Sequence, residues 1–140
     1  MAIPKALRLE FVTPAQAIVH DEVDEVELPG EEGYFGVLPG HAPLLAALKT
    51  GVMWYRKGGD TRYAFVDGGF AEVLPDRVAI LAPVAEHAND IDVQRAEAAK
   101  RRAEDRLARP ASDLDADRAR IALIKALSRL QVSRHRRPRA

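Results

Sequence analysis

The chain has 140 residues, of which 47% are hydrophobic, enough for one domain or for a domain with a small appendage. It contains no cysteine, which excludes disulfides, thiolate metal sites and cysteine nucleophiles. Basic and acidic residues balance at 21 each. No stretch approaches the roughly 20 apolar residues of a membrane span, and the start lacks a secretion signal. We therefore expect a folded protein that its own sequence neither exports nor inserts into a membrane.

The zero net charge hides an uneven distribution. Residues 1–94 carry seven basic and fifteen acidic side chains, a balance of minus eight. Residues 95–140 carry fourteen basic and six acidic ones, a balance of plus eight. Such asymmetry indicates that the two parts contact different partners, or that each can contact the other.

Short strands are predicted along the first part of the chain, which holds all nine glycines and all eight aromatic residues. Gly58-Gly59, Gly68-Gly69 and Pro75-Asp76 are typical hairpin signals. Many short strands without helices between them favour a β-sandwich or flattened barrel. The alternating or doubly apolar runs that predict strands are 7–12, 26–28, 34–38, 52–55, 63–66, 70–74 and 77–81.

After Pro83 the pattern becomes helical. Asn89 or Asp90 is expected to cap a first helix, and Arg109-Pro110 is expected to end it. Small residues follow the helical period on one side of this helix, which permits close packing against a second helix.

Ser112 with an acid three residues later predicts the start of the second helix, which runs to about Val132. The connection is only a few residues long, so the helices form an antiparallel hairpin. The predicted fold is α+β, with an N-terminal β-sandwich or flattened barrel in residues 1–86 and a C-terminal two-helix hairpin in residues 87–140.

The second helix is apolar over more than half of its circumference, which is more than one partner helix can cover. Arg118, Lys125 and Arg129 share the narrow remaining sector. These three side chains are predicted to meet water, phosphate or acidic residues, and a plain solvated face is the alternative.

No catalytic or metal site can be assembled from the sequence. The three serines lie in the helical part and the four histidines are far apart. The carboxylates of residues 21–27 alternate along a predicted strand and are interpreted as a solvated face. The glycines of residues 30–36 match neither a phosphate loop nor a dinucleotide fingerprint. We therefore expect neither catalytic residues nor a metal.

The arginine-rich segment 134–139 could bind nucleic acid through phosphate contacts. No aromatic residue accompanies it, however, and the predicted sandwich is acidic. We expect a disordered, solubilising end and no nucleic-acid partner.

Three motifs carry a resemblance to a known family. Residues 33–45, GYFGVLPGHAPLL, resemble the G-x-F/L-G-x-L/Y-P-G-H-A-P-L-L signature of the epsilon subunit family of bacterial F-type ATP synthases. Residues 68–73, GGFAEV, resemble that family's G-G-x-x-E-V hairpin, and residues 91–96, IDVQRA, match its I/L-D-x-x-R-A helix start. The resemblance covers about residues 7–132.

The resemblance implies a non-catalytic rotor subunit of the central stalk, peripheral to the membrane at the cytoplasmic face of the bacterial inner membrane. Its sandwich would bind the gamma subunit and the ring of c subunits. Its hairpin would either fold onto the sandwich or extend along gamma toward the catalytic alpha and beta subunits, where it hinders ATP hydrolysis. The apolar second helix would then have two alternative surfaces to bury. An independent β-sandwich binding module with a basic helical tail is the alternative.

By the same resemblance, two polar loops at one end of the sandwich face the c ring. The predicted contacts are Glu31, Glu32, Tyr34 and His41. The alternative is that the Pro-Gly turn and His41 only shape their loop.

The family's nucleotide-binding members use the helix-start motif, a preceding glutamate, a later arginine and basic residues of the second helix. Lys125 stands where an arginine is expected, so we expect any regulatory ATP to bind weakly, and no other cofactor. The alternative is that Asp92 only stabilises the helix N-terminus and pairs with Arg95. The matching residues are Glu86, Ile91, Asp92, Arg95, Ala96, Arg102, Lys125 and Arg129.

Overall fold

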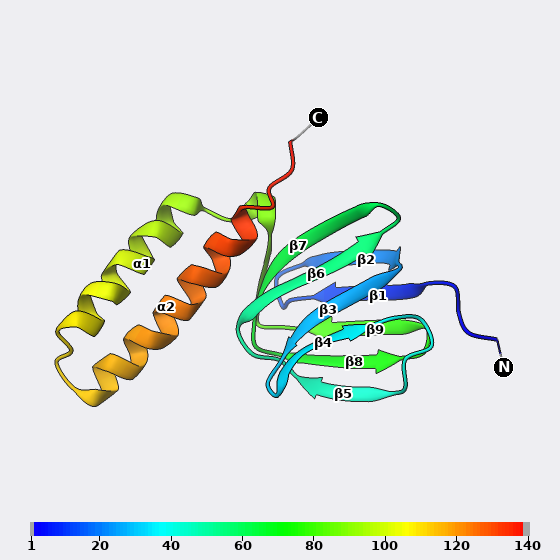
Figure 1. Cartoon of the computed structure of the whole chain (residues 1–140), viewed down its shortest axis with the longest axis horizontal. Coiled ribbons are helices and arrows are strands. Elements are labelled where there is room, and N and C mark those ends of the chain that lie inside the picture. Colours follow the sequence, from blue (N-terminus) through cyan, green and yellow to red (C-terminus); the bar gives the residue numbers. More distant parts are fainter. Residues whose placement is uncertain (1, 139–140) are drawn as a thin grey trace.

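The structure is a computed structural model that describes residues 2–138 (Figure 1). The predicted α+β order, β-structure followed by a helical hairpin, is confirmed. The strands are β1 (Leu7–Val12), β2 (Ala17–Val23), β3 (Glu25–Gly30), β4 (Gly33–Val37), β5 (Leu44–Ala47), β6 (Gly51–Lys57), β7 (Asp60–Asp67), β8 (Phe70–Leu74), β9 (Arg77–Leu81) and β10 (Val84–His87). The helices are the 3-10 helix η1 (Ala88–Asp90), α1 (Val93–Ala108) and α2 (Asp113–Ser133).

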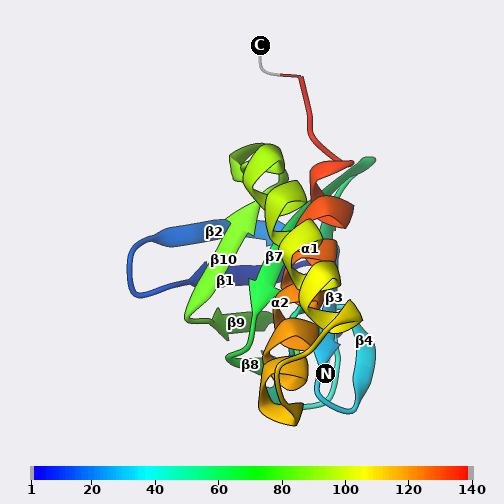
Figure 2. The same ribbon diagram turned by 90° about the vertical axis from the view of Figure 1, so that its left-hand side faces the viewer.

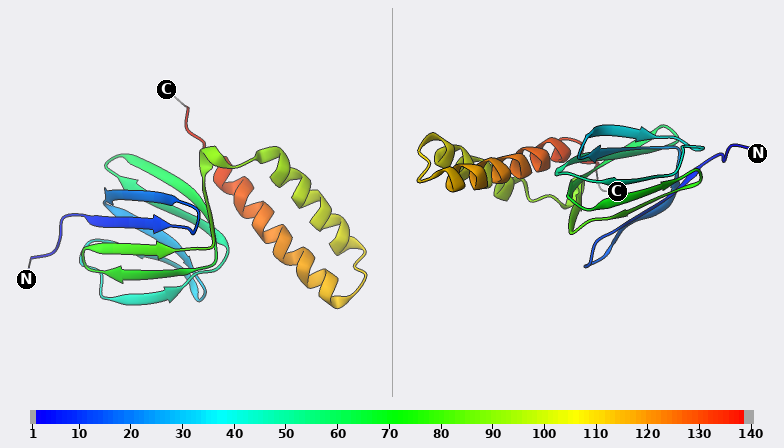
Figure 3. Two further views of the ribbon diagram at one scale, coloured as in Figure 1. Left: turned by 180° about the vertical axis from the view of Figure 1, so that it is seen from behind. Right: turned by 90° about the horizontal axis from the view of Figure 1, so that it is seen from below.

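The strands form two sheets that stack as a sandwich, with the hairpin projecting from one end (Figure 3). The first sheet has the order β2-β1-β9-β8-β5, and the second has the order β10-β7-β6-β3-β4. Edge strands β4 and β5 lie on the same side of the sandwich, where the amide of Glu31 donates to the carbonyl of Ala47 at 2.9 Å. This side is referred to below as the β4–β5 edge.

Strand alternation supplies the core between the sheets. In β1, Leu7, Leu9 and Phe11 are fully buried, whereas Arg8 and Val12 point outward. Burying one such side chain contributes roughly 1.5–3 kcal/mol. The other strands repeat the pattern, so the sandwich has a hydrophobic core of its own.

The outer face of the second sheet carries the hairpin. A separate apolar cluster joins Val52 and Phe65 of the sheet to Ala88, Ile91 and Val132. Figure 2 shows the two helices side by side in front of the sandwich. Because this cluster lies at the C-terminal end of α2, the turn between the helices lies far from the sandwich (Figure 1).

Three ion pairs link the basic hairpin and its tail to the acidic sandwich. The Lys125 ammonium lies 3.2 Å from the Asp67 carboxylate. The Arg129 guanidinium lies 2.6 Å from the Glu86 carboxylate, and Arg137 pairs with Asp60. In each pair the hairpin side supplies the cation, so the two oppositely charged parts of the chain contact each other.

Both helix boundaries at the hairpin turn agree with the sequence, but the predicted start of the first helix is wrong. The hydroxyl of Ser112 accepts from the amide of Asp115 at 3.0 Å, as predicted for the second helix. The first helix is capped by Asp92, whose carboxylate accepts from the amide of Arg95 at 3.0 Å. The predicted caps, Asn89 and Asp90, lie in η1 instead, because the chain leaves β10 through this short turn.

Two predictions within the sheets are also wrong. Gly68-Gly69 does not close a hairpin, because β7 and β8 belong to different sheets. Both glycines have positive φ, and a Cβ on Gly69 would lie 2.2 Å from the carbonyl oxygen of Leu81. The segment after Pro83 continues as β10, which pairs with β7 before any helix begins.

The C-terminal end differs from the prediction as well. It is not a disordered segment over residues 135–137, because the His135 ring stacks on Tyr63 and Arg137 pairs with Asp60. Arg139 lies outside the described residues. None of the helices within residues 2–138 is long and apolar enough to cross a membrane.

Candidate functional site

A hollow of about 290 Å³ lies between the two helices and the end of β10. Its floor consists of the small side chains Ala96, Ala99, Ala122 and Ala126, which keep the space open. The charged residues that line it are Glu86, Asp92, Arg95, Arg102, Lys125 and Arg129. Four basic and two acidic groups therefore surround one space, which is suited to an anion.

All of the predicted nucleotide-binding residues line this hollow except Ile91. That side chain is only 1% exposed and belongs to the cluster under α2. The Ile91 side chain therefore supports the hairpin and does not line the hollow.

The cations of the hollow differ in their freedom. Arg129 is engaged by Glu86, and its guanidinium also lies 4.4 Å from the centre of the Phe65 ring. Lys125 is engaged by Asp67. Arg95 and Arg102 are exposed and form no ion pair within residues 2–138, so they are free to meet an anion.

Sequence reasoning missed the two sandwich residues that hold the α2 cations, Phe65 and Asp67. Phe65 reads as one more apolar strand residue, and only its outward orientation on β7 brings it under the helix. No spacing in the sequence could reveal that contact, because it joins segments about sixty residues apart.

The predicted c-ring residues lie along the β4–β5 edge but not at one end of it. Glu31 and Glu32 occupy the turn before β4, whereas His41 follows β4 at its other end. The His41 Nδ1 lies 2.6 Å from the carbonyl oxygen of Ala42, so this ring also shapes its own loop.

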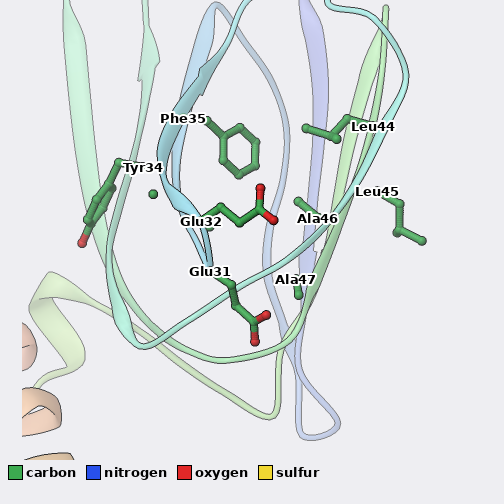
Figure 4. Close-up of a pocket in the computed structure, with 10 residues that line it drawn as sticks. Glu31, Glu32, Tyr34, Phe35, Leu44, Leu45, Ala46 and Ala47 are labelled. Atoms are coloured by element: carbon green, nitrogen blue, oxygen red, sulfur yellow. The ribbon is translucent and has the colours of Figure 1, made fainter.

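A hollow of about 430 Å³ opens on the same edge, between the turn before β4 and strand β5 (Figure 4). Tyr34 points away from the other labelled side chains, and its hydroxyl accepts from the amide of Val52 at 3.2 Å. Leu45 is 73% exposed at the rim. This edge therefore combines Glu31 and Glu32, which form no ion pair within residues 2–138, with exposed apolar surface.

A further surface went unnoticed in the sequence. The outer face of the first sheet exposes Val12, Leu45, Phe70 and Leu81, and we call these four residues the first-sheet patch. Phe70 and Leu81 are directly paired across β8 and β9 and are each 58% exposed. In the sequence, only the apolar residues at outward-facing as well as inward-facing positions of these strands could have indicated this patch.

Within the part of the chain that the structure describes, no three His, Asp or Glu side chains are placed to hold a metal ion. The candidate sites are the charged hollow between the helices, the β4–β5 edge and the first-sheet patch.

Comparison with known proteins gives consistent matches over most of the chain. Residues 6–88 match the family described as ATP synthase, Delta/Epsilon chain, beta-sandwich domain. Residues 89–134 match ATP synthase, Delta/Epsilon chain, long alpha-helix domain.

Individual relatives agree with these matches. The ATP synthase epsilon chain of Nitratidesulfovibrio vulgaris (strain DP4) is 50% identical over 128 residues, which cover 91% of this chain and 96% of the relative. That of Syntrophobacter fumaroxidans is 51% identical over 127 residues, or 91% and 95% of the two chains. A chain in the cryo-EM structure of the Euglena gracilis mitochondrial ATP synthase has a TM-score of 0.83 and 24% identity, covering 96% of this chain and 85% of that one. This last likeness shows the fold.

Proposed function

Because this chain belongs to the delta/epsilon chain family of the ATP synthase, we propose that it acts in the central stalk, coupling rotation to catalysis and restraining ATP hydrolysis. It is a non-catalytic accessory subunit of the ATP synthase. The alternative of an independent β-sandwich binding module is therefore wrong. We assign binding of the gamma subunit and the c ring to residues 1–86, and regulation to residues 87–140. The subunit would sit peripherally at the cytoplasmic face of the bacterial inner membrane.

The regulatory proposal rests on the apolar surface that α2 leaves uncovered. One side of α2 packs against α1 and the second sheet, while Leu114, Ile121, Ile124 and Leu127 are 45–59% exposed on the other side. A broad apolar stripe on a charged helix is typical of a surface that binds a partner. We assign this stripe to contacts with gamma and the catalytic alpha and beta subunits when the hairpin extends.

Deleting residues 88–140 tests the regulatory role, because it keeps all of the sandwich strands. We expect assembly and proton-driven synthesis to persist and ATP hydrolysis to rise. A finer test replaces Ile121 and Ile124 with serine, with Glu104→Ser, an exposed residue of α1, as the control. Hydrolysis that stays unchanged in both the deletion and the serine variant would contradict a role as inhibitor.

For the gamma subunit, the first-sheet patch is the proposed contact, since it is the apolar face that the hairpin does not cover. Phe70→Asp should abolish capture of gamma by the isolated subunit, because a charge in a desolvated contact is costly. Gln16→Asp in the β1–β2 turn is the control. Undiminished capture by Phe70→Asp would place gamma elsewhere.

For the c ring, the β4–β5 edge is the proposed contact. Glu32→Cys and His41→Cys, at opposite ends of β4, should both cross-link to the polar loops of the ring if this side lies along it. Ala15→Cys in the β1–β2 turn should not react. Failure at both edge positions would remove the proposal.

Weak ATP binding to the helical hollow completes the proposal. Arg95 and Arg102 are free to contact phosphates, but Arg129 and Lys125 must first leave their carboxylate partners. No aromatic side chain lines the hollow to stack on the base. Calorimetry should show heat at millimolar ATP that is lost in Arg95→Ala and kept in Arg101→Ala, an exposed arginine of α1 outside the hollow. Heat that is indifferent to Arg95 would leave Asp92 and Arg95 with only their roles at the helix start.

A further inference from the structure

The chain leaves α2 and turns back onto the sandwich instead of running into solvent. Its contacts begin with Val132, which is fully buried against Val52 and Phe65. They continue with His135, whose ring stacks on Tyr63 at a centroid distance of 3.6 Å and an interplanar angle of 14°. Both contacts join the end of the hairpin to the outer face of the second sheet.

Two arginines extend the same attachment. The side chain of Arg136 donates to the carbonyl oxygens of Ala88 and Ile91 in the connection between the sandwich and α1. Arg137 forms an ion pair with Asp60 and donates to the carbonyl oxygen of Thr61. Ala88 and Ile91 lie between β10 and α1, and Thr61 lies in β7, so the two arginines tie the C-terminal end to both the connection and the sandwich.

The backbone of Arg137 is held as well. Its amide donates to the side-chain oxygen of Asn89 at 2.8 Å, and the side-chain nitrogen of Asn89 donates to its carbonyl oxygen at 2.8 Å. A reciprocal pair of this kind fixes one position of the tail relative to η1. This pair joins the two ends of the hairpin to each other, whereas Arg137 with Asp60 and His135 with Tyr63 join the tail to the sandwich.

We propose that residues 132–137 form a C-terminal latch that locks the hairpin onto the sandwich and sets how often it is released. The inference builds on the proposed regulation by the hairpin, because a hairpin that is released more often would dock more often on its partners. The latch lies beside the small apolar cluster at the base of the hairpin.

The test measures release directly in the full chain, apart from any effect on catalysis. The protein has no cysteine, so Ala15→Cys in the β1–β2 turn and Glu104→Cys on the exposed side of α1 can carry a donor and an acceptor dye. The latch variant is His135→Ala/Arg136→Ala/Arg137→Ala. The matched control is Arg101→Ala/Arg106→Ala, which removes two exposed arginines of α1 that form no ion pair within residues 2–138.

In the latch variant we expect the fraction of molecules at long dye separation to rise about tenfold or more, since several hydrogen bonds to charged groups are lost together. The control should match the parent chain. A second variant, Asp60→Asn/Tyr63→Leu, attacks the latch from the sandwich side and should give the same shift. Equal distance distributions in the parent and both latch variants would overturn the proposal.

Failure of the latch and failure of the inhibitory role give different results. If dye separation changes in the latch variant while hydrolysis by the assembled enzyme does not, the latch stands and the inhibitory role of the hairpin falls. If both change together, with hydrolysis falling as release rises, both proposals are supported.

Discussion

The core of the sandwich and the attachment of the hairpin are built from different kinds of contact. Between the sheets, Leu9, Phe11 and Met53 are fully buried side chains with apolar neighbours on every side. Under the hairpin, a small apolar cluster is surrounded by ion pairs such as Lys125 with Asp67 and Arg129 with Glu86.

This difference separates a permanent part of the molecule from a reversible one. Returning large apolar side chains to water costs much free energy, so the sandwich core stays closed. Charged pairs on the surface cost little to separate, because each ion regains its hydration. A hairpin attached by a small apolar cluster and such pairs can leave the sandwich without unfolding it.

The largest expected effect is in the sandwich core. Phe11→Ala should lower the free energy of unfolding by about 3–5 kcal/mol, because it leaves a cavity between the two sheets. Urea denaturation followed by tryptophan fluorescence measures it. Val12→Ala, the next residue on the same strand but on the outer face, should change stability by only about 0.5 kcal/mol. Similar losses at both positions would contradict the proposed division between core and surface.

At the base of the hairpin, Ile91→Ala should cost about 2–4 kcal/mol of hairpin docking. The sandwich should keep its stability. Hydrogen exchange would then accelerate in α2 and remain slow in β1 and β9. Ile121→Ala, on the exposed side of α2, is the control and should leave hydrogen exchange unchanged in both the helix and the strands. Equal acceleration in the helices and the sandwich would show that the two parts unfold as one unit.

The local chemistry of the chain made most of this fold predictable. Ser112 with Asp115 marks a helix start by a hydrogen bond across one turn, and the structure contains that bond. Gly58-Gly59 closes a hairpin because β6 and β7 pair directly, as the turn signal indicates. Such features depend on neighbours within a few residues.

Features that depend on distant neighbours were not predictable. Gly68-Gly69 carries the same turn signal as Gly58-Gly59, yet it crosses between the sheets, because the next strand pairs with β9 instead of β7. The arginines of the C-terminal end look solvated in sequence, and only the arrangement of β7 and η1 brings Asp60 and Asn89 to meet Arg137. In the hollow, the family resemblance named the charged residues that the structure gathers around one space, but it could not show that Ile91 faces the sandwich.

Removing one ion pair between the hairpin and the sandwich should have a smaller effect on hairpin docking. Arg129→Ala removes a pair with Glu86 and a contact with the Phe65 ring, and both residues of the pair are 31% exposed. We expect a loss of about 1 kcal/mol in hairpin docking without nucleotide. Hydrogen exchange of α2 measures it, with Arg118→Ala as the exposed control. A loss as large as that of Ile91→Ala would mean that charge, rather than the apolar cluster, dominates the attachment.

Two carboxylates report separately on the two parts of the molecule. Asp21 accepts hydrogen bonds from the Lys57 side chain and the Glu22 backbone amide, both in the sandwich. These bonds hold the pKa of Asp21 below its ordinary value of 3.8. Asp60 accepts a hydrogen bond from Arg137 of the latch and a second one from Arg62. The first, and to a smaller extent the second, holds the pKa of Asp60 below the same value. When the pKa is lowered, the ionised carboxylate stabilises the folded state at pH values above the ordinary pKa. This contribution is lost as the pH falls through the lowered pKa.

Loosening the hairpin should therefore move one pKa and not the other. In Ile91→Ala, and more fully in Arg137→Ala, the pKa of Asp60 should rise toward 3.8, with the remaining depression supplied by Arg62. The pKa of Asp21 should stay where it is, because Lys57 and Glu22 belong to the sandwich. Carboxyl chemical shifts followed by NMR between about pH 2 and pH 6 measure both groups in one sample. Parallel shifts of the two carboxylates would show that the substitutions disturb the sandwich itself, whereas a rise confined to Asp60 identifies reversible docking through the C-terminal end.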